Sequence, residues 1–271
     1  MTAIFITTFI CDIAKIKLQM LNPLLVRRGF FLFGDTVKSD LLCNMESKYP
    51  GQKKIYGFYH KIINQIPKHK IYYELCAGMA EIAKLLIEKK STASFFLNDP
   101  DKAVTDKLIY MVPEATILGY DAIKLLKKLK AADTKTFVFI DPPYLHSTRP
   151  NSTKLYNYEM SDSDHKQLLS SVLQLKCNTM IVHPVCELYD TYLKGWRKVI
   201  IKVRYHNKTS VECLYMNYDV PEQLQVDAFL GTDCWDRQRI KRKANSLVQK
   251  LSALPELERN FVIKRVQEKF V

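Results

Sequence analysis

The sequence has no C-x-x-C pair, although it contains seven cysteines at scattered positions. Zinc sites commonly take two ligands from such a pair, so its absence argues against a bound zinc ion. Most of the cysteines lie in apolar runs, where a free thiol usually serves as a small hydrophobic side chain. We therefore expect no metal, and a reducing, cytoplasmic location.

A long run of uncharged residues is also missing, and without one no helix can span a bilayer. The N-terminal stretch "MTAIFITTFICDIAKIKLQML" is apolar but lacks a basic start, is interrupted by Asp12, and has no clear cleavage site. We expect no membrane partner. Residues 1–44 are treated as an N-terminal extension, and a recognisable domain is expected from Met45, itself a possible start residue, to residue 220.

Acidic residues are too few to balance the basic ones. The chain has 41 Lys and Arg against 28 Asp and Glu, which gives a formal net charge of +13. An excess of this size favours a polyanionic partner, above all nucleic acid. The alternative is that the charge serves only solubility.

Short apolar β-like runs alternate with amphipathic helical segments from residue 55 to 193, without internal repeats or low-complexity segments. Such alternation predicts an α/β fold, with a mostly parallel, Rossmann-like sheet and helices on both faces. Two longer β-like runs, 196–207 and 210–218, are expected to form a closing antiparallel hairpin joined by Lys208-Thr209. After Pro221 the pattern predicts a basic helical segment over 221–271, with helices at 235–250 and 255–269. The expected strands are 70–75, 92–99, 115–118, 135–140 and 178–184.

Ligands of open α/β sheets bind beyond the carboxyl ends of the strands, so the residues that follow each predicted strand are the candidates. The first strand leads into a tight turn, Glu74 to Ala80, with Gly78 at its centre. The next two lead to Asp99 and Asp121, and the fourth to the string Asp141-Pro142-Pro143-Tyr144. Gly78 could also serve packing alone, and the two acids are equally good helix caps.

The chain resembles the Dam-like, D12 class of DNA adenine N6-methyltransferases, in the compact form common in bacteriophages and prophages. The resemblance covers roughly residues 46 to 269. It rests on the ordered set "KYPGQKKIYGFYHKIINQIP", "YYELCAGMAEIA", "LND", "DPPYLHSTR", "ECLYMNY" and "RQRIKRKANSLVQKLSALPELER". It implies a class I methyltransferase fold and the cofactor S-adenosylmethionine.

The resemblance also assigns residues. It implies that the cofactor is bound by Tyr49, Pro50, Gly51, Lys53, Glu74, Cys76, Ala77, Gly78, Asp99, Asp121 and Asp141. The catalytic motif would be Asp141, Pro142, Pro143 and Tyr144. Cys76 stands where the family usually has Phe, Ala80 where it has a second Gly, and Gln52 where it has Gly. These departures put cofactor affinity, and hence activity, in question.

The catalytic motif suits direct transfer of a methyl group from the cofactor to the amine of a base, without a covalent intermediate. The Asp141 carboxylate and the Pro142 carbonyl would accept the two N–H bonds of an exocyclic amine, so that the lone pair stays on nitrogen during attack. Proline fixes the backbone that carries these acceptors. Tyr144 would stack on a base flipped out of the duplex. The sequence has no Pro-Cys dipeptide of the kind used in cytosine-C5 methylation.

Candidate DNA contacts lie in three places. The polar loop 145–165 would read bases, or would be an ordinary surface loop; the hairpin and the basic helix would contact phosphates. The predicted DNA-binding residues are Arg149, Asn151, Lys154, Tyr156, Tyr158, Lys202, Arg204, Lys208, Arg237, Arg239, Lys241, Arg242 and Lys243.

Several alternatives stay open. The methyl acceptor could be cytosine N4 in DNA or adenine in RNA, and a non-catalytic DNA-binding relative would keep the same fold. No fused endonuclease motif is evident, although a cognate restriction nuclease could be a separate partner. A monomer is expected from the family.

Overall fold

The computed structural model describes residues 58–149, 154–205 and 208–270, with the backbone alone at 203–205 and 208–210. The chain divides into two units between Tyr49 and Pro50, and the first unit lies outside the described residues. The predicted extension, 1–44, lies outside them too. The domain boundaries expected near residues 45 and 221 stay predictions.

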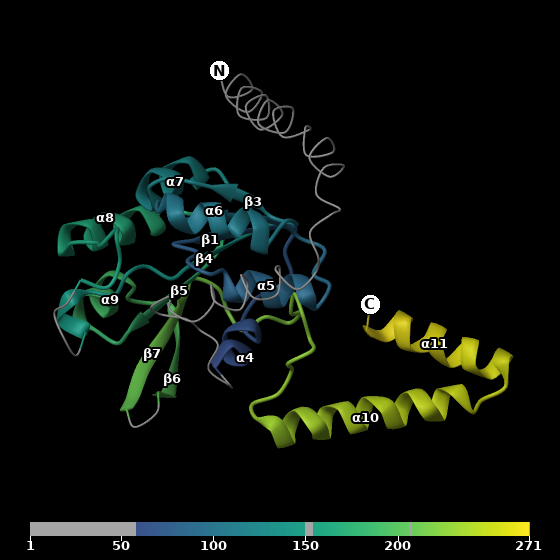
Figure 1. The fold of residues 1–271 in the computed structure, drawn as a ribbon. Coiled ribbons are helices and arrows are strands. Elements are labelled where there is room, and N and C mark those ends of the chain that lie inside the picture. Colours follow the sequence, from purple (N-terminus) through teal and green to yellow (C-terminus); the bar gives the residue numbers. More distant parts are fainter. Residues whose placement is uncertain (1–57, 150–153, 206–207, 271) are drawn as a thin grey trace, which may run out of the picture. The chain divides into compact units, whose positions relative to one another are not determined.

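A seven-stranded sheet in the order β3-β2-β1-β4-β5-β7-β6 forms the centre of the described fold (Figure 1). The first five strands pair in parallel, whereas β7 runs antiparallel to both β5 and β6. The expected mostly parallel sheet with a closing antiparallel hairpin is therefore confirmed. The strands are β1 (Ile71–Leu75), β2 (Ser94–Asn98), β3 (Thr116–Leu118), β4 (Thr136–Ile140), β5 (Asn178–Pro184), β6 (Arg197–Tyr205) and β7 (Lys208–Met216).

Helices cover both faces of the sheet. Tyr73 and Leu75 of β1 share a core cluster with apolar residues of α7, α8 and α9. Alternate side chains of a strand point to opposite faces, so Glu74 faces the other side, where it bonds to the backbone of α5. The described helices are α4 (Phe58–Ile63), α5 (Glu81–Glu88), α6 (Lys102–Met111), α7 (Ala122–Leu129), the 3₁₀ turn η1 (His146–Thr148), α8 (Asp162–Val172), α9 (Glu187–Tyr192), α10 (Cys234–Ser252) and α11 (Glu256–Phe270).

Side-chain caps explain where the helices after the strands begin. Asp121 accepts a hydrogen bond from Lys124 N at the start of α7. At α6 the cap is Asp101, which accepts from Ala103 N, rather than Asp99. Ser161 and Asp164 form a capping box at the start of α8. Asp99 therefore does not cap α6, and its carboxylate can take part in contacts at the carboxyl end of β2.

The closing hairpin turns earlier than expected. Lys208 and Thr209 were predicted to connect its strands, but both belong to β7, where they pair with Tyr205 and Arg204 of β6. That prediction was wrong. Threonine is β-branched and fits a pleated strand better than a tight connection, so its local preference agrees with the observed position. The corrected register places Glu212 opposite Pro184 of β5.

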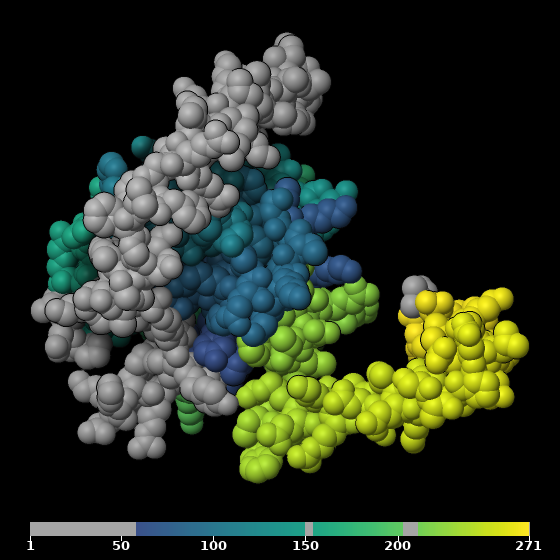
Figure 2. Space-filling view, turned by 45° about the vertical axis from the view of Figure 1, so that its right-hand side comes forward, coloured from purple at the N-terminus to yellow at the C-terminus, as the bar shows by residue number. Residues whose placement is uncertain are grey.

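Helices α10 and α11 confirm the predicted C-terminal pair to within a few residues and contain no buried residue. Their side chains form open surface along the side seen in Figure 2. Among the described helices, none has the length and apolar character that crossing a bilayer requires. The C-terminal pair therefore contributes surface rather than core.

Candidate active site

Three strand ends place the predicted functional residues side by side. Leu75 of β1 is paired with Asn98 of β2 on one side and with Ile140 of β4 on the other. The next residue of each strand is Cys76, Asp99 and Asp141, respectively. Parallel strands end at the same edge, so the sheet brings a thiol and two carboxylates to one place.

The turn after β1 is held in an unusual backbone conformation. Cys76, Gly78 and Ala80 all have positive φ, at 57°, 51° and 50°. The turn is tied to β2, because Ala77 N donates to Asn98 O at 2.9 Å and Gly78 N donates to the Asp99 Oδ2 atom at 3.0 Å. Only glycine adopts positive φ without steric cost, so Cys76 and Ala80 are strained here. These are also two of the positions at which the sequence differs from the usual residues of the D12 class.

The carboxylates gather around this turn. Burial raises the pKa of Cys76 well above its ordinary value, and the charges of Asp99, Asp141 and Asp121 add to the effect. The charges of all three predicted acids therefore disfavour the thiolate form of Cys76. Burial also raises the pKa of Asp99. Asp121, by contrast, is exposed at the start of α7.

Asn98 fixes the turn that carries Asp121. Its side chain makes two hydrogen bonds to Tyr120, donating to the carbonyl and accepting from the amide, each at 2.9 Å. Asn98 is fully buried at the end of β2. The sequence places Asn98 and Asp99 at this strand end but assigned a role only to Asp99, whereas the structure shows that Asn98 joins β2 to the Gly119-Tyr120-Asp121 turn.

Glu74 lies inside the fold. Its Oε2 atom accepts from the Tyr72 hydroxyl at 2.9 Å and from Ala83 N at 3.1 Å. Burial raises the pKa of Glu74 to about 8. The predicted cofactor contact of Glu74 stays a prediction, because in this structure the carboxylate joins β1 to the first turn of α5.

The catalytic motif follows β4 closely. Asp141 N donates to Leu75 O at 3.3 Å, which links the motif to the end of β1. Pro142 is buried, while Asp141, Pro143 and Tyr144 are half-buried. The Tyr144 hydroxyl donates to the Glu212 Oε2 atom at 2.9 Å, and the next amide, Leu145 N, donates to the His183 Nε2 atom at 3.2 Å.

The loop after the motif is organised by one ion pair. The Arg149 guanidinium donates to both carboxylate oxygens of Glu159, and its Nε atom donates to Tyr144 O at 2.9 Å. Glu159 also accepts from the amides of Leu155 and Tyr156. The Arg149 side chain is only 3% exposed. Its predicted base contact stays a prediction, because in this structure its donors bind Glu159 and Tyr144.

The same loop reaches the end of β2. Asn157 donates to the Asp101 Oδ2 atom at 2.8 Å, and Asp101 directly precedes α6. Tyr156 is half-buried, and burial followed by the charge of Asp141 raises its pKa. Lys154 and Tyr158 are exposed, so their predicted DNA contacts are sterically open. Asn151 lies outside the described residues, as do Tyr49, Pro50, Gly51 and Lys53.

The remaining predicted DNA contacts lie on the hairpin and on α10. Lys202 is exposed on β6, and the backbone places Arg204 on β6 and Lys208 on β7. On α10, Lys241, Arg242 and Lys243 are exposed, Arg237 is half-buried, and Arg239 pairs with Asp236 at 2.7 Å. Basic side chains thus line a solvated helix, as the sequence predicts.

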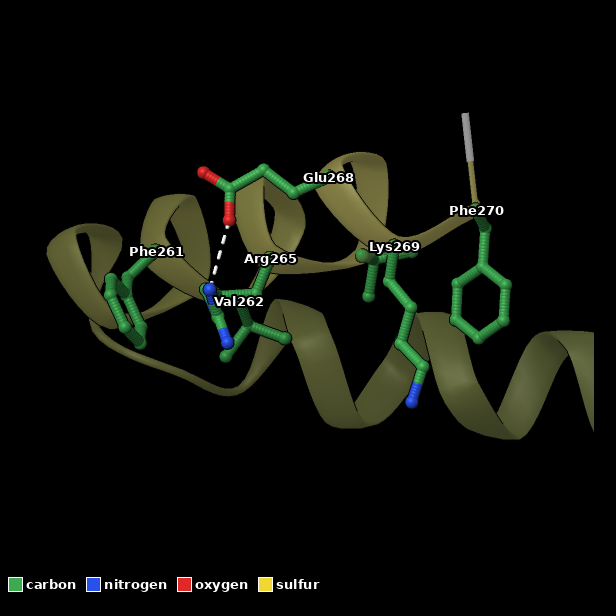
Figure 3. A pocket seen from close by; sticks show the side chains of 7 residues that line it. Phe261, Val262, Arg265, Glu268, Lys269 and Phe270 are labelled. Atoms are coloured by element: carbon green, nitrogen blue, oxygen red, sulfur yellow. Dashed lines mark hydrogen bonds and ion pairs between the residues drawn. The ribbon is translucent and has the colours of Figure 1, made fainter.

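A hollow away from the strand ends does not form a competing site. A hollow of about 600 Å³ lies on α11, beside the Arg265–Glu268 ion pair (Figure 3). All its lining residues come from α11, so no second element contributes chemistry. Within the described ranges, no group of three His, Cys, Asp or Glu residues could hold a metal ion.

Glu212, His183 and Glu159 were not predicted as site residues. Glu212 stands in "ECLYMNY", which carried the family resemblance but no assigned role. His183 is the next-to-last residue of the predicted strand 178–184, and a polar side chain near the carboxyl end of a strand is a signal for function. Glu159 gave no signal beyond its place in the polar loop.

Comparison with known families supports the resemblance. Residues 88–210 match the family model described as D12 class N6 adenine-specific DNA methyltransferase. The matched range includes Asp99, Asp121 and the whole Asp141–Tyr144 string, but not the turn 76–80 or Glu212. The expected D12 resemblance is thus confirmed over these residues. No curated protein matches the sequence.

Solved structures with similar folds include several methyltransferases. M. capricolum TrmK, in complex with S-adenosyl-homocysteine, is 10% identical, with a TM-score of 0.41, over 77% of this chain and 93% of that chain. Pyrococcus abyssi tRNA (uracil-54, C5)-methyltransferase, also with S-adenosyl-L-homocysteine, is 12% identical, with a TM-score of 0.39, over 58% and 36%. Thermotoga maritima spermidine synthase is 13% identical, with a TM-score of 0.41, over 61% of each chain.

Proposed function

Because residues 88–210 match the D12 class, we propose that the chain is an S-adenosylmethionine-dependent methyltransferase that acts on adenine N6 in DNA. The observation that carries the proposal is the position of Asp141-Pro142-Pro143-Tyr144. The string follows a buried parallel strand and adjoins the turn after β1. That is the edge at which an open α/β sheet binds its ligands.

The strand ends fit this cofactor. Both oxygens of Asp99 already accept a backbone amide, from Gly78 and Asp101. A carboxylate can accept about four hydrogen bonds, so Asp99 keeps capacity for ribose hydroxyls. Asp121 is exposed and suited to the adenine amine, and the surrounding negative charge favours a cationic ligand. When bound, S-adenosylmethionine supplies an electrophilic methyl group on a sulfonium centre.

Asp141 and Pro142 would hold the acceptor amine. The carboxylate of Asp141 and the carbonyl of Pro142 each accept one N–H bond, which keeps electron density on nitrogen and stabilises its developing positive charge. Fixed proline φ angles mean that these acceptors need little reorganisation. No covalent enzyme intermediate is required. The proton lost from nitrogen after transfer passes to solvent.

DNA would reach the site with its target base flipped out. Tyr144 offers an aromatic face for that base, and stacking offsets part of the cost of unpairing it. The loop 154–160 is joined to the motif through Arg149, which pairs with Glu159 and donates to Tyr144 O, and the loop supplies Lys154 and Tyr158 as exposed contacts. Exposed basic residues of α10 would contact phosphates, which gives affinity without sequence preference.

The test is methylation in cells that lack other DNA methylation. The full chain and its Asp141→Ala variant are expressed separately, and the DNA of each culture is sequenced with detection of modified bases. N6-methyladenine in one short recurring motif is expected with the full chain and not with the variant. Circular dichroism of both purified proteins checks that the variant is folded.

Other outcomes would redirect the proposal. N4-methylcytosine would keep the enzyme class but change the acceptor base. Unmodified DNA, together with cofactor binding by the purified protein, would indicate RNA rather than DNA as the methyl acceptor. Unmodified DNA without cofactor binding would refute methylation and would indicate that Cys76 and Ala80 mark a non-catalytic relative.

A further inference from the structure

We propose that Glu212 is a positioning residue that holds the ring of Tyr144 for stacking on the flipped base. This inference rests on the proposed function and extends it to a residue outside the matched family range. Glu212 lies on β7 and is 1% exposed. Its Oε2 atom accepts from the Tyr144 hydroxyl at 2.9 Å, across 68 residues of sequence.

The bond suits orientation rather than chemistry. A hydroxyl that donates to a carboxylate makes a charge-assisted bond, which is stronger and more directional than a neutral one. The acceptor lies on an inner strand of the sheet: β7 is paired with β5 on one side and with the edge strand β6 on the other, and Glu212 is opposite Pro184 of β5. A rigid strand therefore fixes the far end of the Tyr144 side chain.

The neighbouring strand fixes the near end. The Tyr144 and His183 rings pack in a T-shaped contact, with centroids 5.3 Å apart and an angle of 68° between the ring planes. Leu145 N donates to the His183 Nε2 atom. His183 Nδ1 lies 2.8 Å from Pro184 O, which can only accept, so the network assigns the proton to Nδ1 and leaves Nε2 as acceptor.

His183 is itself immobilised. It stacks on Tyr189 of α9 with centroids 3.9 Å apart and an angle of 8°. The backbone of Tyr144 has a further anchor, because its carbonyl accepts from Arg149. Contacts at the hydroxyl, the carbonyl and the following amide thus define one ring orientation. A platform ordered before the base arrives loses less conformational entropy when it binds.

Two conservative substitutions test the proposal. Tyr144→Phe removes the hydroxyl and keeps the stacking face, whereas Glu212→Gln removes the charge and keeps the shape. The methyl-transfer rate is measured in single turnovers, at saturating cofactor, on DNA that carries the motif found by sequencing. Tyr218→Phe is the matched control, because its hydroxyl donates to Gln65 O at 2.9 Å, outside the site.

Each site variant is expected to lower the transfer rate by about tenfold, the usual effect of removing one charge-assisted bond. The double variant should be no slower than either single variant, because both remove the same bond. 2-Aminopurine at the target position should be quenched less by the aromatic ring at position 144 in both single variants. Single-variant rates equal to that of the control, or decreases that multiply in the double variant, would overturn the proposal.

A second readout does not depend on activity. The protein is labelled with 3-fluorotyrosine, and Tyr144→Phe identifies the fluorine resonance of Tyr144. Glu212→Gln should shift and narrow that resonance, because the ring gains freedom, and the Tyr218→Phe control should not. An unchanged Tyr144 resonance would overturn the proposal even if no methylation were found, and a shifted one would support it in that case.

Discussion

Glu74 shows how burial changes the chemistry of one side chain. Its pKa is raised from 4.5 to about 8, mainly by burial, so the folded protein keeps this proton to higher pH than the unfolded chain. The free energy of unfolding should therefore fall as the pH rises from about 4.5 to about 8. Glu74→Gln keeps an acceptor for Tyr72 and Ala83 but removes the titration. Thermal unfolding across this range should be less pH-dependent in the variant, and parallel pH curves would contradict the assignment.

Lys90 is a second residue whose local conformation has an energetic cost. It follows α5 with a φ of 63°, and the amides of Lys90 and Ser91 donate to the carbonyls of Ile87 and Leu86. This is a Schellman motif with lysine where glycine is preferred. Lys90→Gly should raise the free energy of unfolding by about 1 kcal/mol relative to Lys90→Ala, which lacks the side chain but keeps the strain. Urea unfolding of both variants measures the difference, and equal stabilities would show that the strain is absent.

At the scale of elements, the loop 154–160 depends on Glu159. The Arg149 guanidinium beside Glu159 holds the pKa of that carboxyl down, to about 2, so the pair persists at any ordinary pH. Glu159→Gln should release the backbone of Leu155 and Tyr156 and make the exposed Lys154 easier to reach. Trypsin should then cut after Lys154 about tenfold faster than in the unaltered chain. Glu88→Gln, an exposed ion-pair variant on α5, is the control and should leave the cleavage rate unchanged.

The elements themselves were largely predictable from the sequence, because their signals are local. The run Phe137–Ile140 is apolar throughout since β4 is buried on both faces, and its burial pattern is uniform. The acids that follow the strands were also found, because parallel strands end at one edge. The hairpin connection was misplaced, because Lys208-Thr209 gives only a weak turn signal and the pairing of the strands decides the register.

The contacts that position the site were not predictable in the same way. Glu212 meets Tyr144 across 68 residues, and His183 meets Leu145 across 38. Neither pairing leaves a periodic pattern in the sequence, since each depends on the order of β4, β5 and β7 in the sheet. Arg149 was expected to face DNA because it is a charged residue in a polar loop. Its bidentate pairing with Glu159 became visible only in three dimensions.

At the scale of the whole molecule, charge variants at two positions can test whether DNA binding depends on the basic residues of α10 or only on the net positive charge. Replacing Lys241, Arg242 and Lys243 of α10 with Gln should weaken DNA binding and reduce its salt dependence, by about 0.9 in log-log slope for each phosphate that the variant no longer neutralises. Unfolding should be unaffected, because α10 has no buried residue. The same change at Lys264, Arg265 and Lys269 of α11 removes equal charge. If both triple variants behave alike, net charge rather than α10 explains the binding.

The hydrogen bond between Asn157 and Asp101 has a consequence for the order in which ligands bind and leave. It joins the loop proposed to contact DNA to the segment that also holds Asp99. If DNA orders the loop 154–160 and the cofactor orders the segment around Asp99, this hydrogen bond couples the two binding events. Coupling between binding sites is reciprocal, so the factor by which DNA changes the affinity for cofactor equals the factor by which cofactor changes the affinity for DNA. Calorimetric titration of the cofactor with and without DNA should reveal this factor, and Asn157→Ala should bring it close to one. An enzyme in which DNA and cofactor strengthen each other's binding in this way would release its demethylated cofactor most readily after it has left the DNA.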